Sequence, residues 1–137
     1  MEINTKEATT IYENLLNEAK KVSVNAYSPY SKYRVGAAIL TKEQRIYVGC
    51  NVENAAYGDT ICAERSAVCN AVANGCRPGD FEAIAIASSG ENFSPCGSCR
   101  QVLQEFGSNI TVIFEFDGKI NTMPLSELLP KGFPKND

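Results

Sequence analysis

The stretch Asp59-Thr60-Ile61-Cys62-Ala63-Glu64-Arg65 places a cysteine and a glutamate in the first turn of a helix that the sequence predicts over Ile61–Asn74. Either of the first two residues of this stretch can cap the helix, and Gly75 is a typical stop signal. A second stretch, Pro95-Cys96-Gly97-Ser98-Cys99, follows a capping serine and begins another predicted helix, which ends before Gly107. Cysteines therefore lie in the first turns of both predicted helices.

Cys62, Cys96 and Cys99 offer three thiolates for one zinc ion. A structural zinc site uses four protein ligands, whereas a catalytic site leaves one position for water. The chain has no histidine, which excludes imidazole ligands and a histidine general base. Glu64, two residues after Cys62, is placed to accept the proton of a zinc-bound water. Taken alone, it is also a common first-turn glutamate that favours the helix dipole.

The remaining cysteines and Arg65 allow alternatives. Three thiolates overcompensate the charge of zinc, so the helix N-termini and Arg65 are candidates for drawing charge from the sulfurs. A solvated surface arginine is an equally good interpretation. Cys50, Cys69 and Cys76 match no ligand position and are interpreted as small apolar fillers. Only Cys69 could serve as a fourth ligand and make a structural zinc module, but it lies two helical turns beyond Cys62.

Length and composition predict one domain over residues 1–137, with 44% hydrophobic content and a formal net charge of -3. An acidic chain lacks the basic patch that a polynucleotide or an anionic membrane requires, so a small uncharged substrate is favoured. No apolar run approaches the length of a membrane span, and Met1–Thr10 is too polar for a secretory signal. We therefore expect a cytoplasmic protein whose cysteines bind metal or stay reduced.

Hydrophobic periodicity predicts an α/β arrangement around these two helices. A helix with one buried stripe is expected over Lys6–Asn25, where apolar residues recur at three- and four-residue steps. A polar, tyrosine-rich loop follows, and then a hairpin, two further strands and a last helical turn. The predicted strands are Val35–Thr41, Arg45–Val52, Phe81–Ala87 and Ile110–Phe116, and the last turn is Ser126–Leu129.

Four segments, in this order and spacing, resemble the small cytidine deaminases. The three-cysteine set with a non-ligand glutamate and a P-C-x-x-C segment is a known pattern of zinc deaminases. The resemblance extends from about Ala26 to Phe133. The segments are Asn51-Val52-Glu53-Asn54-Ala55-Ala56-Tyr57, Cys62-Ala63-Glu64-Arg65, Ser94-Pro95-Cys96-Gly97-Ser98-Cys99-Arg100-Gln101 and Leu128-Leu129-Pro130.

The resemblance implies a three-layer α/β/α fold with a five-stranded mixed sheet. It implies zinc on Cys62, Cys96 and Cys99, with Glu64 as the proton shuttle, in agreement with the chemistry of these residues. It also implies a homotetramer whose active sites lie between subunits, with no nucleic acid or membrane partner. The reaction implied is hydrolytic deamination of cytidine and 2′-deoxycytidine to the uridines and ammonia, in pyrimidine salvage. Activated water attacks C4 of the base while Glu64 protonates N3.

Further residues gain roles in substrate binding from the same resemblance. Asn51 and Glu53, two residues apart at a strand end, point to one side and are expected to bind the 3′-hydroxyl of the sugar. A solvated turn is the more usual interpretation of such a pair. The resemblance places Tyr33 against the base, where many relatives have phenylalanine; a half-buried loop aromatic is the alternative. It also assigns nucleoside contacts to Ala55 and Tyr57 of one neighbouring subunit, to Phe133 of another, and to the backbone of Ala63 and Cys96.

Two rival functions remain open at this point. A deaminase of a cytosine-containing antibiotic such as blasticidin S shares the zinc motifs, although the Asn51-x-Glu53 pair and the loop before Val35 favour a plain nucleoside. A structural zinc module that binds a protein or RNA would need a fourth ligand, for which only Cys69 is available.

Overall fold

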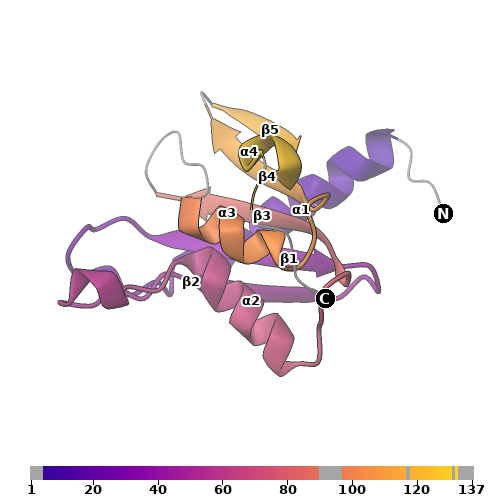
Figure 1. The fold of residues 1–137 in the computed structure, drawn as a ribbon. Helices are drawn as coiled ribbons and strands as arrows, with labels where there is room; N and C mark the ends of the chain where they lie inside the picture. The colour runs from indigo at the N-terminus through magenta and orange to yellow at the C-terminus, as the bar shows by residue number, and fades with distance from the viewer. Residues whose placement is uncertain (1–4, 90–96, 117, 131, 133–137) are drawn as a thin grey trace.

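A five-stranded mixed sheet forms the middle layer of the computed structural model, which describes residues 5–89, 97–116, 118–130 and 132 (Figure 1). Its strand order is β2-β1-β3-β4-β5, in which only β3 and β4 are parallel neighbours. The strands are β1 (Val35–Thr41), β2 (Ile46–Cys50), β3 (Phe81–Ser88), β4 (Thr111–Phe116) and β5 (Lys119–Pro124).

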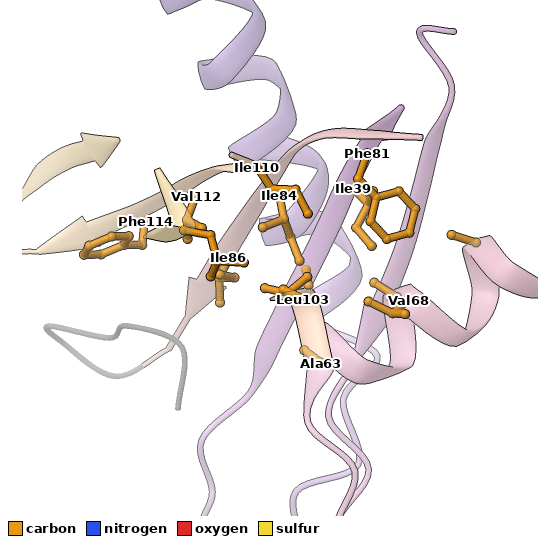
Figure 2. Packing of buried hydrophobic residues seen from close by; sticks show 14 of the residues in the cluster. Ile39, Ala63, Val68, Phe81, Ile84, Ile86, Leu103, Ile110, Val112 and Phe114 are labelled. Atoms are coloured by element: carbon orange, nitrogen blue, oxygen red, sulfur yellow. The ribbon is translucent and has the colours of Figure 1, made fainter. Parts of the chain in front are cut away.

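Helices cover both faces of this sheet. On one face, α1 (Thr5–Ser23) packs Leu15, Leu16 and Ala19 against small and branched residues of β1, β3 and β4. On the other face, α2 (Ala63–Ala73) and α3 (Gly97–Gln104) bury Ala63, Val68 and Leu103 against the sheet, as Figure 2 shows. Because two layers cover it, β3 is buried along nearly its whole length. The expected three-layer α/β/α fold with a mixed sheet is thus confirmed.

Two glycines let the helices approach the sheet closely. A Cβ atom at Gly36 of β1 would lie 2.0 Å from the carbonyl oxygen of Ala19 in α1, and one at Gly49 of β2 would lie 2.3 Å from the backbone nitrogen of Ala67 in α2. Only glycine fits such distances without moving backbone atoms. The contact at Gly49 places the N-terminal end of α2 beside the end of β2, where the candidate site lies.

The predicted helix start needs correction. Helix α2 begins at Ala63, and Cys62 is its N-cap residue, with extended backbone and no side-chain capping bond. Neither Asp59 nor Thr60 caps it, because η1 (Tyr57–Asp59) intervenes and the Thr60 hydroxyl accepts a hydrogen bond from the backbone of Asn54 instead. The stop signal is confirmed, since Gly75 has the left-handed φ of 102° that ends the helix.

Other boundaries differ by small amounts. The end of α3 before Gly107 is as expected, while its predicted start at Pro95 lies outside the described residues. The sequence pattern did not predict β5, and α4 (Leu125–Leu128) begins one residue earlier than expected. Within the described part of the chain, no helix combines the length and the apolar character needed to cross a bilayer.

Candidate active site

A cavity of about 660 Å³ lies where the end of β2 meets the start of α2. It contains residues from three segments: the loop before β1, the chain after β2, and the first turn of α2. Eight of the residues that line it were singled out from the sequence, namely Tyr33, Asn51, Glu53, Tyr57, Cys62, Ala63, Glu64 and Arg65. Segments distant along the chain therefore line one cavity.

Some predicted site residues lie elsewhere. Ala55 is exposed and does not line the cavity. Cys99 is fully buried in the first turn of α3 and interacts with the Glu64 carboxyl group without lining the cavity. Cys96 and Phe133 lie outside the described residues. Their predicted roles, like those of the residues in the cavity, stay predictions.

Glu64 is the most deeply buried ionisable residue of the cavity, with 1% of its surface exposed. Neither carboxylate oxygen has a hydrogen-bond partner of ordinary geometry among the described residues. Burial is the main cause that raises the pKa of Glu64, and the charge of Cys62 raises it further, while the backbone amide of Glu64 itself and, to a smaller extent, Cys99 and Arg65 act in the opposite direction. A carboxylate in this position accepts a proton more readily than an exposed one, which is the property that a general base requires.

Arg65 contacts the predicted zinc thiolate. Its guanidinium Nη2 donates to the carbonyl oxygen of Thr60 at 3.2 Å and lies 3.9 Å from the Sγ atom of Cys62. The side chain is partly buried rather than a solvated surface arginine. A positive charge at this distance can withdraw charge from the sulfur atom.

Asn51 and Glu53 are both held by the loop before β1. Asn51 is buried, and its amide group joins two backbone positions: Oδ1 accepts from the Val35 nitrogen at 2.9 Å, and Nδ2 donates to the Tyr33 carbonyl at 3.0 Å. The Glu53 carboxylate accepts from the backbone nitrogens of Tyr30 and Ser31 at 2.9 and 3.1 Å, and from the Ser31 hydroxyl. The pair is therefore not the solvated turn that was the alternative interpretation.

These hydrogen bonds set the charge of Glu53. The Ser31 hydroxyl is the main cause that lowers the pKa of the Glu53 carboxyl group, and the two backbone donors and the charge of Lys32 act in the same direction against its partial burial. Glu53 is thus ionised throughout the neutral range. Sequence reasoning missed Ser31 as a site residue, because its partner lies 22 positions away and no local pattern indicates the contact.

The comparison with known proteins decides what kind of site this is. Residues 9–115 match the family described as the cytidine and deoxycytidylate deaminase zinc-binding region. The chain belongs to the cytidine deaminase family. A cytidine deaminase from Sporosarcina psychrophila is 46% identical over 128 residues, covering 91% of this chain and 93% of that protein.

Solved structures agree with the sequence relatives. The crystal structure of cytidine deaminase from Burkholderia pseudomallei has a TM-score of 0.82 and 42% identity, covering 88% of this chain and 98% of that chain. A blasticidin-S deaminase from Bacillus cereus is also similar, at 29% identity over 145 residues, covering 99% of this chain and 91% of that protein. As a member of the cytidine deaminase family, the chain is a hydrolytic deaminase with zinc as its cofactor.

The described residues fit the zinc of a cytidine deaminase. Cys62 and Cys99 both interact with the carboxyl group of Glu64, neither of whose oxygens has a hydrogen bond of ordinary geometry to a described residue. Thiolates are donors that zinc prefers, and a carboxylate without a partner suits a site that holds a water. Within the ranges that the structure describes, no three histidine, cysteine or acidic side chains form a complete metal-binding set, and Cys96 falls in the gap at 90–96.

Proposed function

We propose that this cytidine deaminase family member hydrolyses the exocyclic amino group of cytidine and 2′-deoxycytidine, releasing ammonia and the corresponding uridine. The observation that carries the proposal is the buried, unpartnered carboxylate of Glu64 in a cavity that also contains Asn51 and Glu53. The first group suits proton transfer at a base, and the other two offer polar atoms to a sugar.

Different residues of the chain have different roles in the proposed reaction. Cys62, Cys96 and Cys99 would hold the zinc ion, which when bound supplies a water that ionises near neutral pH. Glu64 would accept one proton of that water and pass it to N3 of the base as hydroxide adds at C4. Glu64 would then take the remaining proton of the added hydroxyl group and pass it to the amino group, which leaves as ammonia. Arg65, in contact with Cys62, keeps the thiolates from cancelling the positive charge that this chemistry needs.

Substrate binding extends from the base to the sugar. The charged carboxylate of Glu53 accepts the 3′-hydroxyl, and Asn51 supports it from the neighbouring position. Tyr33 offers an aromatic face for the base, and the backbone at Ala63 and Cys96 orients it.

Assembly is part of the proposal. Tyr57 lines the cavity yet has 91% of its surface exposed in the single chain, which is typical of a side chain that a second subunit covers. We propose a homotetramer in which Ala55, Tyr57 and Phe133 complete neighbouring sites. The remaining parts of the proposal are one functional domain over residues 1–137, a cytoplasmic location and a place in pyrimidine salvage.

The test of the chemistry is Glu64→Gln. The amide keeps the shape of the side chain but cannot shuttle protons, so we expect unchanged zinc content and a loss of kcat at or beyond the upper end of the roughly 10²–10⁴-fold typical of general acid–base groups. Loss of cytidine absorbance in the ultraviolet follows the reaction. Retention of more than about a tenth of wild-type kcat would exclude this role for Glu64. Blasticidin S, assayed beside cytidine with the wild-type protein, tests the antibiotic-deaminase alternative.

The test of the zinc site compares cysteines. We expect Cys62→Ala, Cys96→Ala and Cys99→Ala to lose zinc on metal analysis, whereas Cys69→Ala keeps it, because Cys69 is exposed on α2 and away from the cavity. If Cys69→Ala lost zinc as readily as the others, the site would have four protein ligands. The structural zinc module would then replace the catalytic interpretation.

A further inference from the structure

We infer that Ser31 is a positioning residue for sugar recognition, in which one hydroxyl group joins the Glu53 carboxylate to the backbone that carries Tyr33. The inference rests on the proposed function, since it assumes that Glu53 binds the sugar and that Tyr33 faces the base. It adds to that function a residue that links the two ends of the substrate.

The Ser31 hydroxyl group makes two hydrogen bonds, one as donor and one as acceptor. Ser31 Oγ donates to Oε2 of Glu53 and accepts from the backbone nitrogen of Tyr33 at 3.0 Å. A serine hydroxyl has one proton to donate and two lone pairs, so both bonds can exist at once. The side chain of Ser31 thus fixes the distance between the carboxylate and the residue that supplies the aromatic face.

The backbone donors alone would leave the Glu53 carboxylate free to rotate about its terminal torsion. The two amide nitrogens, of Tyr30 and Ser31, both donate to Oε1 of Glu53. The terminal torsion of a glutamate is broad, so bonds to a single oxygen hold that oxygen while the other can swing. The Ser31 hydroxyl, by holding Oε2, converts this arrangement into a two-point attachment with a defined carboxylate plane.

The loop that presents Ser31 is itself well fixed. Its turn is closed by the Lys32 nitrogen donating to the Ser28 carbonyl at 3.1 Å, and Lys32 has the left-handed φ of 68°. At its start, the backbones of Tyr27 and Glu53 are joined by a bond of 2.8 Å. A hydroxyl group held on such a turn can orient the Glu53 carboxylate. A hydroxyl group on a mobile loop would instead move together with the carboxylate.

The experiment measures kcat and KM for cytidine and for 3′-deoxycytidine, which lacks the hydroxyl that Glu53 would bind. Four proteins are compared: wild type, Ser31→Ala, Ser31→Thr and Ser28→Ala. For Ser31→Ala we expect kcat/KM for cytidine to fall about tenfold, mainly through KM, and to fall clearly less for 3′-deoxycytidine. Ser31→Thr keeps the hydroxyl and should restore the preference. Ser28→Ala removes a hydroxyl from the same loop but none of the Glu53 bonds, and should match wild type.

Two results for Ser31→Ala would overturn the inference while the proposed function stands: equal losses of kcat/KM on both substrates, which leave the preference at its wild-type value, or no loss on either substrate. Failure of Ser31→Thr to restore the preference would also overturn it. A wild-type protein that does not deaminate cytidine, or that treats both substrates alike, would instead refute the proposed function. Thermal melting checks the fold of each variant. If Ser31→Ala does not fold, Ser31→Cys, a weaker donor, takes its place with the same expected loss of preference.

Discussion

Burial of Glu64, the proposed proton shuttle, has a cost in folding free energy. Its carboxylate is buried, and no hydrogen bond of ordinary geometry to a described residue compensates for the lost water. A buried polar group without a partner costs about 1–3 kcal/mol of folding free energy. Under the proposed function a zinc-bound water would offset this penalty, so we expect the penalty to be visible once the metal is removed.

We therefore expect chelator-treated Glu64→Gln to be more stable at pH 7 than chelator-treated wild type, by about 1–3 kcal/mol. Burial raises the folded-state pKa of Glu64 above its ordinary value of 4.5, so folding becomes less favourable as the pH rises above that value. At pH 4.5 and below, the carboxyl group is increasingly protonated in both states, and the difference between the proteins should shrink. Urea denaturation at several pH values measures it.

Glu82→Gln is the matched control, because Glu82 is exposed on β3 and its substitution should leave the urea midpoint almost unchanged. Equal midpoints of wild type and Glu64→Gln at pH 7 would contradict the prediction. A difference that did not shrink toward lower pH would contradict its ionic cause.

Individual site residues were predictable where the chemistry is local in sequence. Cys62 and Glu64 are two residues apart, so the known zinc-deaminase pattern could be matched to them directly from the sequence, and their roles stay predictions. The partners of Asn51 and Glu53 were not predictable, because they lie in a loop 16 to 23 positions earlier in the chain. The sequence contains the residues of such a network, while only the fold shows which atoms meet.

At the scale of elements, the contact between β2 and α2 positions the site. We expect Gly49→Ala to destabilise the protein by about 1–3 kcal/mol or more, because the new methyl group would lie 2.3 Å from the backbone nitrogen of Ala67 and backbone atoms cannot move aside independently. Gly58→Ala is the control, since nothing lies within 4 Å of a Cβ atom there. Urea denaturation of both variants tests this, and equal midpoints would show that α2 can shift without loss.

Elements were predicted well where burial creates a clear pattern. The strand over Val35–Thr41 is buried at every position and was predicted with the observed bounds. β5 (Lys119–Pro124) was missed because it is a half-exposed edge strand. Its sequence ends in a proline and shows little alternation of apolar and polar residues. The start of α2 was misplaced because η1 takes up Asp59, and the backbone of Cys62 forms the cap without a side-chain bond.

At the scale of the whole molecule, the described part of the chain leaves Tyr57, which lines the candidate site, 91% exposed. If a second subunit covers Tyr57, wild type should sediment as a tetramer at micromolar concentration. We expect Tyr57→Asp to shift the distribution toward smaller species, because a charge would be buried at the contact. The specific activity of this variant should then fall on dilution. A wild-type protein that sediments as a monomer and is fully active would contradict the assembly.

The burial of β3 along nearly its whole length has a consequence for the chain before it folds. Phe81–Ser88 includes one charged residue, Glu82, and no proline, because in the folded protein two helical layers shield the strand. In the unfolded chain the same run is a short apolar segment able to pair with copies of itself. Its native partners β1 and β4 are distant in sequence, so they cover it late. Refolding from denaturant therefore competes with aggregation through β3, and its yield should depend on protein concentration far more than on buffer salt.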